Sequence, residues 1–336
     1  MERYYLGSNT AKGFCGLYDV ALKDMKHTIL LKGGPGTGKS TLIKKVAEEG
    51  RKKGYDVEVW HCSGDPSSLD GVYIKGLEKA VVDATSPHAI EPTIPVVKES
   101  IVNLLDCVDR HILVSNAYAI EKHANDKKQR FVSAYEHLNI AFCYYKRIER
   151  TLDESIDKAR LRLSTRRIID EIKMKSVCGG RRKRGVERFD MAITPDGLHG
   201  FFDHLVDKEI CLIKGEAVTV DLFLKELVRG VTPDYVLKDG FVSNNLSGLV
   251  VHDLAIVKNV GSCTPHRIID LTVYEGDKRF QVGYSKMSQD EEIATAVSDI
   301  KEARLAHADI EKFYVEAMDF DRLDEMTEKV LREVLT

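Results

Sequence analysis

Two separate parts of the chain combine an apolar strand-like run, a short loop and an apolar helical run. In ILLKGGPGTGKSTL, residues 29–42, the apolar run precedes a glycine-rich segment. Apolar residues then recur at helical spacing, at Leu42, Ile43, Val46 and Ala47. In CLIKGEAVTVDLFL, residues 211–224, a similar run leads through Lys-Gly into another helical pattern. Both segments predict a buried strand followed by a loop and a helix.

Two long stretches contain neither glycine nor proline, residues 96–178 and residues 284–336. Apolar residues in the first stretch are spaced as on a helix, as at Ile101, Leu104, Leu105, Val108 and Ile112. Absence of punctuating residues over such lengths indicates helices. The first stretch is long enough that we expect it to fold back on itself near His123–Lys128. Each strand-rich part is therefore expected to be followed by a helical arm.

The two parts also match each other along the whole chain, in one order. The paired segments are residues 2–19 with 187–203, 69–74 with 246–251, 85–93 with 263–272, and 137–145 with 307–315. This pattern indicates a tandem duplication with a boundary near Gly179-Gly180. We expect an α/β protein in which residues 1–180 form one unit with an arm at about 96–178. Residues 185–336 would form the second unit, with a helical tail at about 285–336.

Residues 33–40, GGPGTGKS, satisfy the phosphate-loop pattern GxxxxGK[ST]. Such a loop aims backbone N–H groups at phosphate oxygens, and glycines allow the required backbone shape. Lys39 would carry its charge to the outer phosphates, and the Ser40 hydroxyl would coordinate Mg²⁺. The expected nucleotide-binding residues are Gly33, Gly34, Pro35, Gly36, Thr37, Gly38, Lys39, Ser40 and Thr41. The sequence therefore predicts a nucleotide site here.

A bound Mg²⁺ also needs a carboxylate at the end of a neighbouring strand. Asp83 directly follows the apolar run Ala80-Val81-Val82, so it is the preferred metal-side acid and a catalytic candidate together with Lys39. Three other acids are rivals for this role: Asp65, Asp70 and Glu91.

The second loop lacks the residues that would hold a phosphate. Aligning Lys214-Gly215 with Lys32-Gly33 pairs Asp221 with Lys39, and the remaining pairs are Gly34 with Glu216, Gly36 with Val218, Gly38 with Val220, and Ser40 with Leu222. A carboxylate in place of an ammonium group opposes anion binding. Matching Pro87-His88 with Pro265-His266 places Gly261 opposite Asp83 and favours a structural turn over a catalytic histidine. We expect one nucleotide site, in the first half.

The segments GGPGTGKSTL, VVDATSPH and AHADIEKFYVEAMDF resemble an uncharacterised family of bacterial tandem P-loop ATPases. The resemblance spans nearly the whole chain. It implies a duplicated P-loop NTPase fold and an ATPase-like activity, and it supplies no established substrate. The phosphate-loop residues make ATP and Mg²⁺ the expected cofactors. The chain departs from the doubled pattern by losing the second phosphate loop.

Composition and missing motifs limit the class of protein, its compartment and its nucleotide. The net charge of −3 argues against a protein that is basic overall. No apolar run is long enough to span a bilayer, and no secretory signal begins the chain. The seven scattered cysteines contain no CxxC pair, which is typical of a reducing, cytoplasmic compartment. Absence of an NKxD or TKxD motif favours ATP over GTP.

Three functions are consistent with these features. The first is an ATP hydrolase or ATP-dependent switch with a regulatory second copy. Transition-state charge would come from Arg267 or Arg229, or from an arginine of a second protomer. The second is a small-molecule or nucleotide kinase, for which the Arg- and Lys-rich residues 146–184 would serve as a lid. The third is a nucleic-acid-associated ATPase, because residues 158–167 and 179–188 form a basic tract. The sequence favours the first and leaves any second substrate or protein partner unidentified.

Overall fold

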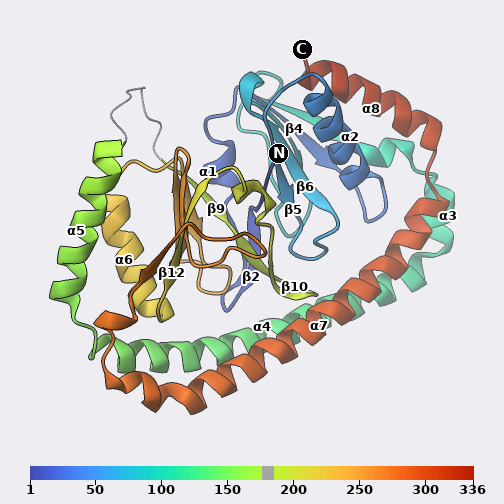
Figure 1. The fold of residues 1–336 in the computed structure, drawn as a ribbon. Helices are drawn as coiled ribbons and strands as arrows, with labels where there is room; N and C mark the ends of the chain where they lie inside the picture. Colours follow the sequence, from blue (N-terminus) through green and yellow to red (C-terminus); the bar gives the residue numbers. More distant parts are fainter. Residues whose placement is uncertain (176–184) are drawn as a thin grey trace.

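The computed structural model describes residues 1–175 and 185–336, so the expected boundary at Gly179-Gly180 lies outside the described residues. The protein is an α/β structure built on one large mixed sheet with helices packed against it (Figure 1). Within these two ranges the sheet has twelve strands, in the order β16-β12-β15-β14-β13-β9-β1-β5-β6-β7-β4-β8. Two separate two-stranded hairpins, β2–β3 and β10–β11, accompany it.

The sheet consists of two six-stranded units that meet at β1 and β9. The first unit contains β1 (Glu2–Tyr5), β5 (Val57–His61), β6 (Leu69–Ile74), β7 (Lys79–Asp83), β4 (His27–Lys32) and β8 (Glu99–Asn103). The second unit contains β9 (Val186–Phe189), β13 (Tyr235–Lys238), β14 (Leu246–Val251), β15 (Leu254–Val257), β12 (Glu209–Lys214) and β16 (Arg267–Asp270). Read outward from the join, the two units have the same succession of parallel and antiparallel pairs. The strands of the two units therefore correspond one to one.

The join itself is an antiparallel contact of Tyr5 with Phe189. Beside it, Arg188 of β9 forms an ion pair with Glu58 of β5, and both side chains are almost completely buried. Glu58 also accepts hydrogen bonds from Trp60 Nε1 at 2.6 Å and from the Tyr235 hydroxyl at 2.8 Å. These extra donors complete the hydrogen bonding of the buried Glu58 carboxylate. With the ion pair alone, burial of this charge would cost more free energy. The two units are thus fastened together through the centre of the sheet.

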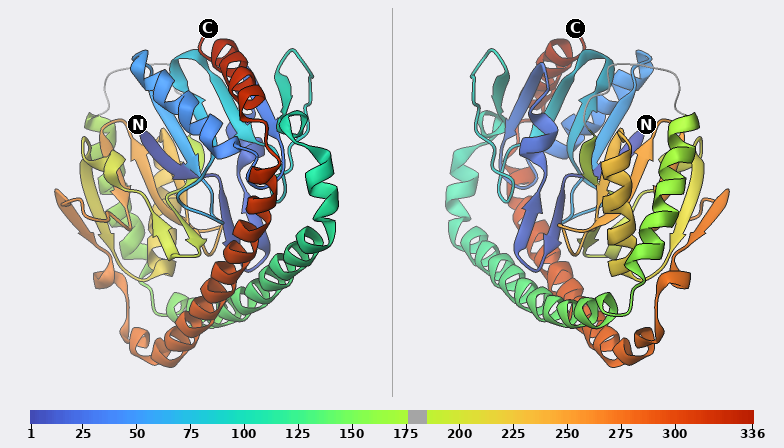
Figure 2. Two further views of the ribbon diagram at one scale, coloured as in Figure 1. Left: turned by 90° about the vertical axis from the view of Figure 1, so that its right-hand side faces the viewer. Right: turned by 90° about the vertical axis from the view of Figure 1, so that its left-hand side faces the viewer.

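Two long helices form the arms. Helix α4 (Ala117–Asp153) and helix α7 (Gly283–Glu316) pack side by side (Figures 1 and 2). They run antiparallel, since Lys127 contacts His307 whereas His137 contacts Glu292. At 37 residues, α4 is about 55 Å long. This length carries the chain from one unit across to the other.

Each arm ends in a helix that covers the other unit. Helix α5 (Lys158–Lys175), which follows α4, packs on α6 (Ala217–Gly230) of the second unit. Helix α8 (Phe320–Val334), which follows α7, packs on α2 (Lys39–Lys52) of the first unit. The buried residues of α8 recur at helical spacing, at Leu323, Thr327, Val330, Leu331 and Val334. The arms therefore exchange their terminal helices between the units.

Two expectations about the first arm are wrong. Helix α4 continues through His123–Lys128, and the chain turns only after Asp153, at the start of α5. The segment around Ile101 is a strand, because β8 pairs in parallel with β4 at the sheet edge. Apolar spacing alone did not distinguish this edge strand from a helix.

Short elements complete the chain. They are the hairpin strands β2 (Gly7–Thr10), β3 (Gly13–Gly16), β10 (Met191–Thr194) and β11 (Gly197–Gly200), the helices α1 (Tyr18–Leu22) and α3 (Arg110–Ser115), and the 3-10 turns η1 (Lys75–Leu77), η2 (Leu104–Cys107), η3 (Asp203–Leu205), η4 (Thr272–Tyr274) and η5 (Asp277–Val282).

Candidate functional site

The glycine-rich loop, residues 33–40, connects β4 to α2 in the first unit. Gly36 and Gly38 have φ angles of +71° and +86°, in the left-handed region that glycine adopts most readily. Helix α2 begins at Lys39, and no side chain caps its N-terminus. The first N–H groups of a helix have no partner within the helix, so here they are available to an anion.

Lys39 turns its side chain back over this loop. Its ammonium group donates to the carbonyl oxygens of Gly34 at 2.7 Å and Gly33 at 3.3 Å. The same nitrogen lies 3.7 Å from Asp83 Oδ2, and both side chains are largely buried. The Thr37 hydroxyl donates to the Gly34 carbonyl at 2.9 Å, which fixes the turn of the loop. The loop thus holds a positive charge above its own backbone.

Asp83 is the last residue of β7, which pairs in parallel with β4. Its Oδ1 accepts hydrogen bonds from the Thr85 amide at 3.0 Å and the Thr85 hydroxyl at 2.6 Å, leaving Oδ2 toward Lys39. Burial raises the pKa of the Asp83 carboxyl, and the charges of Lys39 and His88 oppose that rise. The sequence-predicted pair of Lys39 and Asp83 is therefore brought together.

The Ser40 hydroxyl oxygen accepts a hydrogen bond from the Leu69 amide at 2.9 Å, while Thr41 is exposed on α2. Ser40 and Asp83 offer hard oxygen ligands of the kind Mg²⁺ prefers. Within the described residues, no cluster of three or more His, Cys, Asp or Glu side chains is suited to a metal ion. The two residues therefore fit a Mg²⁺ that takes its other ligands from phosphates and water.

The three rival acids have other partners. Asp65 forms an ion pair with Arg304 at 3.0 Å and accepts hydrogen bonds from Ser67 and Ser68. Glu91 pairs with Lys32 at 2.6 Å near the protein surface. Asp70 is buried and accepts a hydrogen bond from the Tyr18 hydroxyl at 3.2 Å.

His88 lies 3.4 Å from Asp70 in a buried position. Burial lowers the pKa of His88, but the Asp70 and Asp83 carboxylates together raise it more, so the net shift is upward. His266, by contrast, is exposed, immediately precedes β16, and accepts a hydrogen bond from the Ile210 amide. Pro87-His88 and Pro265-His266 therefore do not occupy equivalent places in the structure. His88 lies well before β8, whereas His266 immediately precedes β16.

The second loop has a different backbone. Helix α6 already begins at Ala217, so helix replaces most of the loop. Asp221 Oδ1 accepts a hydrogen bond from the Leu246 amide at 2.9 Å, just as Ser40 accepts one from Leu69. Asp221 thus corresponds to Ser40, and the buried Val220 corresponds to Lys39. The sequence pairing of Asp221 with Lys39 is wrong by one residue, because the segment from Lys214 to Asp221 is one residue shorter than the segment from Lys32 to Ser40.

The register of β12 with β15 also revises the counterpart of Asp83. Leu212 pairs with Val257 as Leu30 pairs with Val82, so the following residue, Lys258, occupies the Asp83 position in place of Gly261. Glu216, at the start of the second loop, binds Lys286 through both carboxylate oxygens. The second unit therefore has no ammonium–carboxylate pair equivalent to Lys39 and Asp83.

The C-terminal arm covers the glycine-rich loop, which the sequence did not indicate. A Cβ atom on Gly34 would lie 2.3 Å from the Tyr314 ring, and one on Gly36 would lie 2.8 Å from the Glu311 carbonyl oxygen. A Cβ on Gly38 would lie 2.7 Å from Leu323 of α8. These glycines are needed for close packing as well as for backbone shape. The only signal in the sequence was the repeat segment 307–315, which contains two of these contacts.

The two arginines expected to supply transition-state charge lie on elements of the second unit. Arg267 of β16 pairs with Glu171 of α5 at 2.8 Å, and Arg229 is exposed near Glu226 on α6. Both belong to the second unit. A different arginine, Arg304 of α7, pairs with Asp65 beside the first unit.

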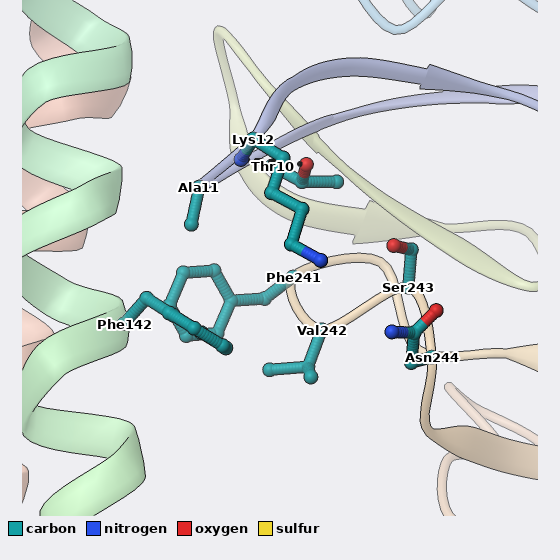
Figure 3. A pocket seen from close by; sticks show the side chains of 8 residues that line it. All are labelled: Thr10, Ala11, Lys12, Phe142, Phe241, Val242, Ser243 and Asn244. Atoms are coloured by element: carbon teal, nitrogen blue, oxygen red, sulfur yellow. Dashed lines mark hydrogen bonds between the residues drawn. The ribbon is translucent and has the colours of Figure 1, made fainter.

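Two shallow cavities lie away from Lys39. The first, of about 30 Å³, lies between the β2–β3 turn, α4 and the segment before β14 (Figure 3). Its lining residues are Thr10, Ala11, Lys12, Phe142, Phe241, Val242, Ser243 and Asn244. The second, of about 20 Å³, follows α5 along the edge of the second unit.

In the part of the chain that is described, no helix has the length and apolar character of a membrane span. Comparison of the chain with protein-family models, with curated proteins and with solved structures found no match. The candidate site consists of a glycine-rich loop, a lysine above it and a carboxylate at the neighbouring strand end.

Proposed function

We propose that the protein is an ATP-binding P-loop NTPase with one nucleotide site, in its first unit. The observation that carries this proposal is the position of the Lys39 ammonium, above the glycine-rich loop and 3.7 Å from Asp83 Oδ2. The matching strand succession of the two units supports a P-loop fold duplicated in tandem. If the bound ATP reacts with water, the protein is an ATP hydrolase or an ATP-dependent switch.

Each residue of the loop has a role in this proposal. The backbone N–H groups of the loop and of the first turn of α2 bind phosphate oxygens. Lys39 leaves the Gly33 and Gly34 carbonyls to bind the outer phosphates. Ser40 and Asp83 hold Mg²⁺, which supplies charge neutralisation on the phosphates. The second unit binds no nucleotide, because helix occupies its loop and Val220 stands in place of the lysine.

The position of α5 favours hydrolase or switch over kinase. A kinase lid formed by residues 146–184 would have to lie over the glycine-rich loop. The described part of this tract ends in α5, which packs on α6 of the second unit. A lid function would require α5 to leave this apolar contact, which includes Ile168, Ile169 and Ile172.

Calorimetric titration with ATP and Mg²⁺ tests the proposal. We expect one ATP per chain, no binding to Lys39→Ala, and wild-type binding by the control Lys44→Ala, whose side chain is exposed on the same helix. Slow phosphate release from ATP alone would support the hydrolase, whereas ADP formation that requires an added small molecule would indicate a kinase. Two equal sites, or unaltered binding by Lys39→Ala, would overturn the proposal.

A further inference from the structure

One cationic side chain from each arm lies close enough to Glu311 to oppose the rise that burial causes in the pKa of its carboxyl, and the Glu311 backbone packs on Gly36 of the glycine-rich loop. Lys127 of α4 donates to His307 Nδ1 at 3.2 Å, and Arg304 of α7 lies 3.0 Å from Asp65. Burial, reinforced by the ammonium groups of Lys127 and Lys39, lowers the pKa of His307 to about 4, so the ring is neutral and accepts this hydrogen bond. Among the described residues, Lys127 has no carboxylate within ion-pair distance. Its charge is therefore not compensated by a direct partner.

Lys127 and Lys39 are close enough to affect each other. Burial lowers the pKa of Lys127, and the positive charge of Lys39 lowers it further, although Cys62 and Glu311 act in the opposite direction. Two ammonium groups placed together away from water repel each other unless an anion lies between them. A polyphosphate at the glycine-rich loop would be such an anion.

Comparison of the two arms supports a chemical role for these cations. Aligning His137 with His307, as in the internal repeat, places Ala134 opposite Arg304 and Val297 opposite Lys127. Both counterparts pack in one apolar cluster with Phe241 of the second unit.

The same replacement occurs in the loop that Arg304 contacts. Aligning β6 with β14 through Leu69 and Leu246 places Val242 opposite Asp65. Val242 packs against that apolar cluster as well. The unit that lacks the phosphate-binding lysine thus also lacks the arm cations and the acid that holds one of them.

We infer that Lys127 and Arg304 complete the nucleotide site by contacting the terminal phosphate of ATP, an inference that rests on the proposed function. Asp65 holds the Arg304 guanidinium near the loop until the phosphate arrives. Because one cation comes from α4 and the other from α7, the terminal phosphate bridges the two arms. A nucleoside diphosphate lacks this bridge, so the two cations distinguish ATP from ADP.

Titration of the full-length protein with ATP and with ADP, each with Mg²⁺, tests the inference. The variants are Lys127→Met and Arg304→Gln, which keep most of the side-chain volume, together with Lys127→Arg and Arg304→Lys. The exposed neighbours Lys128→Met and Lys301→Met are matched controls. We expect Lys127→Met and Arg304→Gln each to lose roughly tenfold in ATP affinity, the order of one charge-assisted hydrogen bond, with ADP affinity within about twofold of wild type. The charge-keeping variants should recover part of the loss.

The outcomes separate the two proposals. If the wild-type protein binds no ATP, or if Lys39→Ala binds like wild type, the proposed function fails. If Lys39→Ala abolishes binding but both arm variants keep the wild-type ratio of ATP to ADP affinity, only the role of the arm cations fails. Equal losses for ATP and ADP, with a lowered melting temperature, would show that Lys127 and Arg304 merely support the structure and would also overturn the inference.

Discussion

Ser40 and Asp221 accept the same backbone hydrogen bond in the two units, from Leu69 in one case and Leu246 in the other, each at 2.9 Å. In the first unit the acceptor is a hydroxyl oxygen available to a metal. In the second it is a buried carboxylate that also binds Lys225 at 2.6 Å. One position has thus kept its contact with the sheet while its chemistry has changed.

This relationship predicts that placing the lysine and serine of the first loop in the second loop will not create a second nucleotide site. The double variant Val220→Lys, Asp221→Ser should still bind one ATP per chain, because α6 already fills the loop from Ala217 onward. Val220 is completely buried, so the new lysine should lower the free energy of unfolding by roughly 2–5 kcal/mol. Calorimetry and urea unfolding measure the two effects. A second ATP per chain would contradict the importance of the loop backbone.

Asp83→Asn should remove the dependence of ATP affinity on Mg²⁺. The amide keeps the contact with Thr85 but loses the charge that we propose to hold the metal. Turnover should therefore fall roughly a hundredfold or more, given that a catalytic metal contributes several kcal/mol. Burial raises the pKa of Asp83, so its carboxyl takes up a proton at a higher pH than an ordinary aspartate does. As the pH falls, Mg²⁺-dependent ATP binding by the wild type should therefore weaken at a pH above the ordinary aspartate pKa. Titrations with and without Mg²⁺ across pH measure both.

The control for this variant is Glu91→Gln, which removes the same kind of charge from the exposed ion pair with Lys32. Glu91→Gln should keep the Mg²⁺ dependence of the wild type. Equal Mg²⁺ dependence in Asp83→Asn and in the control would show that Asp83 does not hold the metal.

The pair of Asp70 and His88 should stabilise the protein within a limited pH window. The pKa of His88 is raised in the folded state, so its contribution is full below the unfolded value of about 6.5 and is lost as pH rises through the folded value. Burial raises the pKa of Asp70, but His88 and the neighbouring hydrogen-bond donors together lower it more, and the contribution of Asp70 is lost as pH falls through its lowered value.

The variant His88→Gln should therefore be destabilised most near pH 5, by about 2 kcal/mol, the order of a buried contact to a charged group. The difference from wild type should shrink above the folded-state pKa of His88. Urea unfolding of both proteins between about pH 4 and pH 9, the range set by these ordinary pKa values, measures it. A pH-independent difference would mean that the pair is not charged.

Gly34→Ala should strain the contact between the glycine-rich loop and α7. The new methyl group would meet the Tyr314 ring at 2.3 Å, and overpacking of this kind costs roughly 1–3 kcal/mol. Adding Tyr314→Ala should recover part of the loss in unfolding free energy, since it removes the ring. A double-mutant cycle measured by urea unfolding checks this coupling. Additive effects would show that the arm does not rest on the loop.

Much of the candidate site could be predicted from the sequence because its determinants are local. Gly36 and Gly38 adopt the left-handed backbone that the phosphate-loop pattern requires, and Lys39 begins the expected helix. Asp83 ends the expected strand. The roles of Asp70, Glu91 and Arg267 could not be predicted in this way, because their partners Tyr18, Lys32 and Glu171 lie far away in the chain.

By itself the sequence determined the strand–loop–helix segments and the absence from the second loop of the glycines, lysine and serine of the first, since backbone preference and charge act over a few residues. The tertiary structure decided that the two units share one sheet and that α5 and α8 each cover the other unit. It also decided that Lys127 and Arg304 lie near Glu311, which packs on the glycine-rich loop. The sequence of an amphipathic helix shows that the helix has an apolar face, but it does not show which surface will cover that face. Here that surface belongs to the other unit, so the site depends on residues from both.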